Sequence, residues 1–244
     1  MNTIKTIGFT VFSDDLNVIP IHGKSCKVLN TISPNSYGVS TKDEEFERAL
    51  KASDYLVLDG VYFSFASLLL QGKNIKRNQG PDVFDHFIHR LNEQHGKAFF
   101  LGSSESTLQK IKDRAKNEYP NIRIETFSPP FKPEFSKQDN KSIIESINAF
   151  NPDILFVGMS CPKQEKWAIE HRKRVNCGLA VCIGNVFDWY ARNQKSIHPI
   201  WFSLRLGWLI RIILRPEIFR RNIGNQLLFF WHIILIFLKI KKYD

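Results

Sequence analysis

Cysteine is scarce in this 244-residue sequence, and no motif pairs it for metal or disulfide chemistry. The four cysteines form no CxxC pair and have no histidine cluster beside them at metal-ligand spacing. They therefore favour reduced, mostly buried thiols in a cytoplasmic protein over a disulfide framework. The N-terminal apolar run is short and soon interrupted, so it does not predict a signal peptide. The cysteines are Cys26, Cys161, Cys177 and Cys182.

Long apolar runs, repeats and low-complexity tracts are also missing. The residues 227–238 are apolar except for His232, but a helix that crosses a bilayer needs about 20 such residues. The sequence contains neither the Walker P-loop nor the GxGxxG motif. Ordinary ATPase and dinucleotide-binding functions therefore lose support.

Acidic residues are few at the C-terminal end of the chain. The whole sequence has 34 Lys and Arg against 24 Asp and Glu, a net charge of +10. The last 54 residues hold ten basic and two acidic residues, a balance of +8 that leaves +2 for the first 190. This distribution indicates an anionic partner at one end: nucleic acid, a membrane surface or a phosphorylated ligand.

From about residue 27, short apolar runs alternate with helical patterns. This alternation predicts an α/β fold, a doubly wound Rossmann-like parallel sheet with right-handed crossovers. A helical, basic and apolar appendage follows, so we expect a domain over 1–196 and an appendage over 197–244. We also expect a turn over 33–38 and a helix capped by Ser40 with Asp43 as its capping-box partner. The predicted strands are 27–32, 55–58, 97–101, 122–127, 153–157 and 178–183, and the other predicted helices are 63–70, 82–95, 105–118, 141–150 and 162–174.

Ligands of such sheets bind beyond the carboxyl ends of the strands, and several polar residues stand there. Asp59 ends a buried strand and can act as a general base, although an Asp-Gly turn explains it better on the residues alone. Gly102 and Ser103 open a GSSES loop that is either a phosphate cradle or a helix cap. Pro162 and Glu165 are good helix-start residues.

That helix-start chemistry does not explain Lys163 or Gln164, which can face a phosphate or a base edge. Asp188 accepts from ribose hydroxyls or begins a helix, and the sequence leaves both readings open.

Taken in order, these segments resemble the bacterial WecG/TagA/CpsF glycosyltransferase family. The resemblance spans about residues 28–222 and rests on a set of ordered motifs. They are SPNSYGVSTKDEEFERAL, LDGVYFSF, KRNQGPD, FFLGSSESTLQK, FSPPFKPEF, NPDILFVGMSCPKQEKW, IGNVFDWYA and RLGWLIRIILRPEIFRR.

The resemblance implies inverting, metal-independent transfer of a sugar from a UDP-sugar to a polyprenyl-pyrophosphate-linked sugar. The sugar would be of the N-acetylmannosamine type or another hexose, and the product a precursor of capsule, exopolysaccharide, teichoic acid or enterobacterial antigen. The alternative is a non-catalytic sugar-nucleotide-binding or membrane-assembly subunit of the same pathway.

The resemblance also assigns roles to individual residues. Asp59 matches the catalytic base, and Asn35 and Gln164 match donor-pocket residues. Ser33 stands where the family often has Thr, Arg77 is assigned to the pyrophosphate, and Asp188 to the nucleoside. Departures at Arg192, 197–199 and Gly207 bear on acceptor recognition more than on the core chemistry.

No Asp-x-Asp occurs in the sequence, so we expect no metal and no cofactor. Charge at the leaving diphosphate must then come from Arg, Lys or helix N-termini. The basic tail is a candidate source, and its arginines are Arg211, Arg215, Arg220 and Arg221.

The apolar and basic tail favours an enzyme peripheral on the inner face of the cell membrane, bound to anionic headgroups. Packing on the protein body or in a homo-oligomer is the alternative. Nucleic acid is not expected as a partner, because it does not explain the aliphatic and aromatic residues around Trp231.

Overall fold

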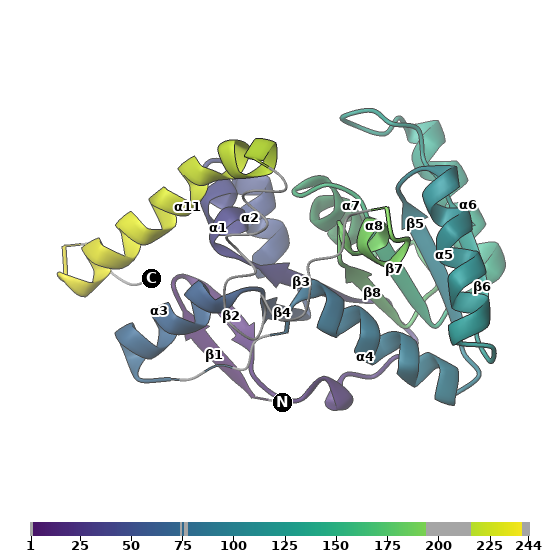
Figure 1. Ribbon diagram of the computed structural model, residues 1–244, viewed down its shortest axis with the longest axis horizontal. Helices are drawn as coiled ribbons and strands as arrows, with labels where there is room; N and C mark the ends of the chain where they lie inside the picture. Colours follow the sequence, from purple (N-terminus) through teal and green to yellow (C-terminus); the bar gives the residue numbers. More distant parts are fainter. Residues whose placement is uncertain (1, 74, 76–77, 194–215, 241–244) are drawn as a thin grey trace.

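The computed structural model describes residues 2–73, 75, 78–193 and 216–240. It confirms the predicted fold class, because its centre is a six-stranded sheet in which every neighbouring pair is parallel (Figure 1). The strand order is β4-β3-β8-β7-β5-β6. The strands are β3 (Lys27–Ile32), β4 (Tyr55–Leu58), β5 (Lys97–Gly102), β6 (Arg123–Phe127), β7 (Ile154–Gly158) and β8 (Leu179–Cys182).

Helices cover both faces of this sheet, as a doubly wound fold requires. Residues of α4 (Gly80–Glu93), α5 (Glu105–Glu118) and α8 (Val186–Tyr190) share one core cluster with Leu29 of β3. Residues of α6 (Lys137–Phe150) and α7 (Lys163–His171) share the cluster on the other face with Val28. Neighbouring strand residues thus point to opposite layers, which follows from the two-residue period of a strand.

Two expectations about the segment after β3 are wrong. The expected turn over 33–38 is part of α1 (Pro34–Ser40), which Ser33 caps by a reciprocal capping box with Ser36. Ser40 therefore ends a helix rather than capping one. Asp43 is itself the N-cap of α2 (Glu44–Lys51), since its carboxylate accepts from the backbone N–H of Phe46 at 3.0 Å.

A third core cluster lies beside the β4 edge of the sheet. It joins Leu56 and Leu58 to a hairpin, to α1 and to two further helices. The sequence analysis did not anticipate the hairpin. These elements are β1 (Thr3–Thr6), β2 (Phe9–Phe12), α3 (Val61–Gln71) and α11 (Pro216–Phe237), and a short 3-10 helix η1 (Leu16–Val18) follows the hairpin.

The helix α11 packs on the protein body along one face, as Figure 1 shows for its course across α1. Phe229 is 0% exposed, with ring centroids 5.4 Å from Tyr37 and 5.1 Å from Phe63. The Tyr37 hydroxyl is 2.8 Å from Nδ1 of His232. This part of the appendage therefore belongs to a core cluster of the catalytic body. The boundary expected at 196/197 lies outside the described residues.

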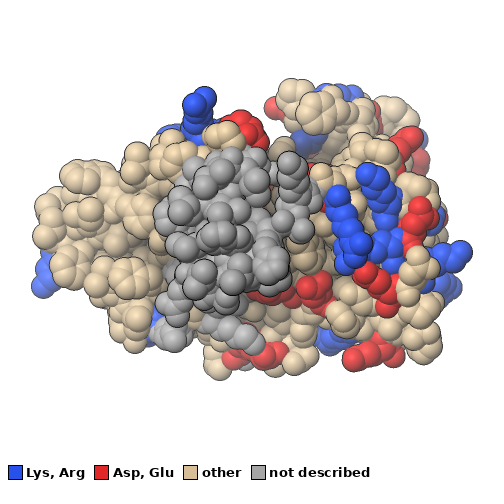
Figure 2. Space-filling view, viewed as in Figure 1, with Lys and Arg blue, Asp and Glu red and all other residues tan. Residues whose placement is uncertain are grey.

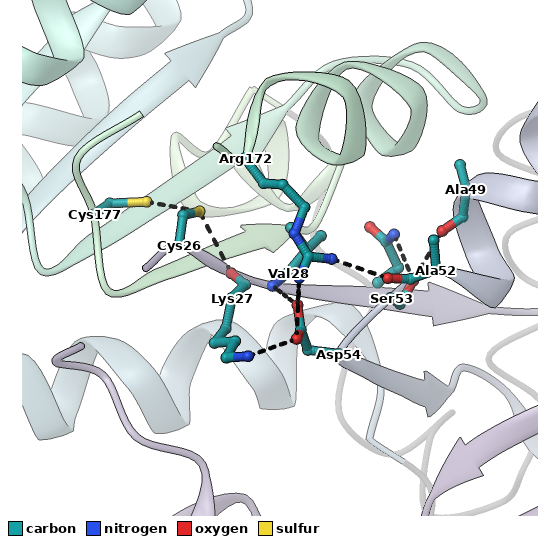
Figure 3. A network of polar contacts seen from close by, with 10 residues as sticks. Cys26, Lys27, Val28, Ala49, Ala52, Ser53, Asp54, Arg172 and Cys177 are labelled. Carbon is teal, nitrogen blue, oxygen red and sulfur yellow. Dashed lines mark hydrogen bonds and ion pairs between the residues drawn. The ribbon is translucent and has the colours of Figure 1, made fainter. Parts of the chain in front are cut away.

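The amino-terminal edge of the sheet is held by polar contacts around Asp54 (Figure 3). Its carboxylate accepts from the backbone N–H of Val28 at 3.0 Å and pairs with Lys27 and Arg172, each at 3.1 Å. Beside it, the thiols of Cys26 and Cys177 lie 3.1 Å apart. All four cysteines are free and three are buried, which confirms the expectation of reduced, mostly buried thiols. The polar groups of this edge are bound to one another.

Candidate functional site

The strand-end motifs meet at the carboxyl edge of the sheet. Asp59 directly follows β4, and its backbone N–H donates to the carbonyl of Ile32 at 2.8 Å, so the ends of β3 and β4 stay in register. Gly60 follows with φ +94°, a conformation that favours glycine. The Asp59 side chain is half-buried. The structure therefore places a carboxylate where a doubly wound sheet binds its ligand.

Ser33 and Asn35 lie at the start of α1, beyond the end of β3. The Ser33 hydroxyl is used in the capping box, where it accepts from the Ser36 N–H at 3.2 Å. The Asn35 side-chain oxygen accepts from Nδ2 of Asn225 on α11 at 3.1 Å. A residue assigned to the donor pocket thus touches the C-terminal helix, a contact that the sequence analysis missed.

Gly102 and Ser103 form a left-handed step between β5 and α5, with φ +121° and +60°. A Cβ on Gly102 would stand 2.6 Å from the carbonyl oxygen of Gly158, and one on Gly158 would stand 2.4 Å from the Phe187 ring. Three motifs are therefore in contact through positions where only glycine fits. Ser104 caps α5 by accepting from the Thr107 N–H at 3.2 Å.

Gln164 joins two motifs by hydrogen bonds and is only 5% exposed. Its side-chain oxygen accepts from the backbone N–H of Gly184 at 3.0 Å, and its Nε2 donates to Glu165 at 2.8 Å. Lys163, one residue earlier, turns elsewhere. Its amine donates to the carbonyl of Lys132 at 2.6 Å and lies 3.4 Å from the centroid of the Phe135 ring. Burial, together with Lys132, lowers the pKa of Lys163.

Asp188 lies on α8 and is tied to the start of α5. Asn193 donates from Nδ2 to Asp188 at 3.3 Å and to the Thr107 hydroxyl at 2.8 Å. Asp188 is thus held beside the GSSES loop, but the structure brings no contact between it and Gln164 among the interactions described.

Two tail arginines are exposed on the first turns of α11. Arg221 is close enough to Cys161, in the loop before α7, to act on it electrostatically. One positive charge of the appendage therefore lies near the carboxyl edge. The other expected arginines, Arg77, Arg211 and Arg215, lie outside the described residues.

Among the described residues, no three His, Cys, Asp or Glu side chains gather in a way that could hold a metal ion. Metal-independent transfer stays a prediction.

Replacing Gly102 by alanine is expected to lower the free energy of unfolding by about 3 kcal/mol. Its φ of +121° strains any Cβ, and the carbonyl of Gly158 leaves no room for one. Gly224 is the matched control, because it lies within α11 and nothing stands within 4 Å of an added Cβ. Gly224→Ala should raise stability by up to about 1 kcal/mol. Urea unfolding of the two variants measures both effects, and equal stability would contradict the packing described.

Burial raises the pKa of Glu165 from 4.5 to about 7. Between these values the folded chain holds a proton that the unfolded chain releases, so rising pH favours unfolding. This stability is fully present below pH 4.5 and is lost by about pH 7, a change of about 3 kcal/mol. Glu165→Gln, which cannot ionise, should gain stability relative to wild type by that amount between pH 4.5 and 8. Urea unfolding at a series of pH values measures the difference, and a difference constant with pH would contradict the prediction.

Together, the parallel sheet and the loops at its carboxyl edge define a doubly wound α/β protein with its ligand site beyond the strand ends. The model of the WecG/TagA/CpsF family of glycosyl transferases matches residues 10–243. The chain therefore belongs to this family and is a glycosyltransferase, as the motifs indicated.

Curated relatives carry one printed name, N-acetylglucosaminyldiphosphoundecaprenol N-acetyl-beta-D-mannosaminyltransferase. The protein of Bacillus subtilis strain 168 is 27% identical over 215 residues, 88% of this chain and 82% of the relative. That of Bacillus spizizenii strain W23 is 24% identical, over 80% of this chain and 74% of the relative. That of Staphylococcus aureus strain NCTC 8325 is 24% identical, over 75% and 70%.

Proposed function

We propose that this chain transfers a sugar, with inversion, from a UDP-sugar to a sugar linked to a polyprenyl diphosphate, in the synthesis of a bacterial cell-surface polysaccharide. The observation that carries the proposal is that Asp59, Asn35 and Gln164 stand on loops of one sheet edge in a chain of this family. The relatives' printed name supports the acceptor class, since it describes transfer of N-acetylmannosamine to a diphosphoundecaprenol-linked sugar.

In the proposed reaction, Asp59 takes the proton of the acceptor hydroxyl. The hydroxyl oxygen then forms a bond to the anomeric carbon while the bond from that carbon to the diphosphate oxygen breaks, and UDP leaves. The transition state has oxocarbenium character, so the departing diphosphate needs positive charge or N–H donors beside it. The N-terminus of α5, the amide of Gln164 and the guanidinium of Arg221 supply these groups at the carboxyl edge.

No helix in the described part of the chain is long and apolar enough to cross a membrane. We propose peripheral attachment to the inner face of the cell membrane through an apolar surface on α3 and α11. This α3/α11 surface consists of the exposed residues Tyr62, Phe65, Leu68, Trp231, Ile234 and Phe237. The two helices touch where the rings of Tyr62 and Phe230 lie 5.2 Å apart.

Figure 2 supports this assignment, because the end of the molecule formed by α3 and α11 shows few charged side chains. Exposed apolar area of this kind is typical of sites that meet a membrane or a protein. A membrane fits the lipid-linked acceptor, which is confined to the bilayer surface. Exposed Lys239 follows α11 and can meet anionic headgroups.

The reaction is tested with wild-type protein, a panel of labelled UDP-sugars and a polyprenyl-diphosphate-linked N-acetylglucosamine acceptor in detergent. We expect label in the lipid fraction from one donor, undiminished by EDTA. UDP binding without transfer from any donor would favour the non-catalytic subunit instead. Absence of both binding and transfer would overturn the proposal.

A further inference from the structure

Glu165 is buried, although the usual role of a glutamate at its position does not require burial. An acid in the first turn of a helix interacts with the helix dipole while it stays in water. Glu165 stands in the first turn of α7 but is only 3% exposed. Its Oε2 is buried without a hydrogen-bond partner in the described part of the protein. Burying a carboxyl group in this way costs free energy, so helix-start chemistry does not account for it.

The partner that Glu165 does have is the side chain of Gln164. Gln164 donates from Nε2 to Glu165 Oε1 at 2.8 Å, and the N–H of Gly184 donates to Gln164 Oε1 at 3.0 Å. A flipped amide would set its oxygen against the carboxyl group and its NH2 against the Gly184 N–H. Both contacts would then be lost, so these two bonds together select one orientation of the amide.

This arrangement lies directly below the carboxyl edge. The thiol of Cys182, the last residue of β8, donates to the backbone carbonyl of Gln164 at 3.7 Å. Gly184, two residues later, has a left-handed φ of +52° and begins the loop that leads to α8. The remaining amide N–H of Gln164 and its second oxygen lone pair stay available for a ligand.

We propose that Glu165 is a positioning residue that fixes the orientation of the Gln164 amide, and through it the loop after β8, for a ligand at the carboxyl edge. The proposal rests on the proposed function in taking that ligand to be the diphosphate or uridine of UDP. Glu165 touches no ligand itself in this account. Its effect on binding passes through Gln164.

The test measures UDP affinity by calorimetry for wild type and for variants of Glu165. Glu165→Leu removes the acceptor and should weaken UDP binding about tenfold, the usual effect of one lost, well-oriented hydrogen bond. Glu165→Asp keeps the charge but is one methylene too short, so it should weaken binding similarly. Glu165→Gln still offers an amide oxygen to Gln164 and should bind within about threefold of wild type. Glu170→Leu, at an exposed glutamate of the same helix, is the control and should leave affinity unchanged.

A double-mutant cycle separates positioning from general destabilisation. If Glu165 acts through Gln164, then Glu165→Leu combined with Gln164→Leu should bind UDP no more weakly than Gln164→Leu alone. Additive losses would overturn the proposal, as would wild-type affinity in both Glu165→Leu and Glu165→Asp. If the leucine variant does not fold, the aspartate variant takes its place in the cycle.

A second readout needs no ligand. In wild type, the side-chain amide of Gln164 should give nitrogen-15 NMR signals that exchange slowly with water, because it is buried and hydrogen-bonded. The signals should persist in Glu165→Gln and exchange rapidly in Glu165→Asp, and equal exchange in the two would overturn the proposal. Wild-type protein that binds no UDP would instead count against the proposed function and leave this readout to decide the positioning role.

Discussion

Asp59→Asn is expected to reduce sugar transfer by a factor of about 10² to 10⁴, the usual contribution of a positioned general base. The amide has the size of the carboxylate but cannot take the proton of the acceptor hydroxyl. UDP affinity should change by less than about threefold, because the base acts on the acceptor rather than on the nucleotide. Initial rates of label transfer, with calorimetry for UDP, separate these two effects.

Asp54→Asn is the matched control, since Asp54 and Asp59 flank the same strand, β4. Asp54 holds Lys27, Val28 and Arg172 at the amino-terminal edge. Its replacement should lower stability and leave transfer by the folded protein unchanged. Undiminished transfer by Asp59→Asn, or an equal loss in both variants, would contradict the assignment of the base.

The triple substitution Trp231→Ser, Ile234→Ser and Phe237→Ser is expected to weaken binding to anionic vesicles at least a hundredfold. The three side chains are 56%, 49% and 58% exposed on α11, so they are free to enter the headgroup region. Each large apolar side chain moved out of water contributes about 1.5–3 kcal/mol. Co-sedimentation with vesicles of phosphatidylglycerol and phosphatidylcholine measures the change.

Phe229→Ala, on the buried face of the same helix, is the control. It should lower the free energy of unfolding by about 3–5 kcal/mol, because it leaves a cavity against Tyr37 and Phe63. The vesicle affinity of the folded fraction should stay as in wild type. Full vesicle binding by the triple variant would show that the α3/α11 surface does not meet the membrane.

Most of the sheet could be predicted, because buried parallel strands read as short apolar runs separated by helical periods. Prediction failed between β3 and α2 for a local reason. The residues of α1 include Pro34, Asn35 and Gly38, which favour turns, but the capping box of Ser33 and Ser36 stabilises a helix start. Gly38 also lets Asn225 of α11 approach, since a Cβ there would stand 2.4 Å from that residue.

The site was predictable to the extent that it follows from topology. The carboxyl ends of parallel strands share an edge, so Asp59, Gly102 and Gln164 were expected there without knowledge of their contacts. The hydrogen bond between Asn35 and Asn225 joins residues 190 positions apart, and no local pattern indicates it. Glu165 was missed because its position in the first turn of α7 already had an explanation, and only its burial shows that more is needed.

Hydrogen–deuterium exchange with and without UDP tests most directly that the carboxyl edge is the ligand site. UDP should slow amide exchange in the loops after β3, β5, β7 and β8, over residues 33–36, 102–105, 159–165 and 184–188. Exchange around Cys26, Lys27 and Asp54, at the amino-terminal edge, should not change. Protection confined to that opposite edge, or absent from all four loops while UDP is bound, would contradict the account.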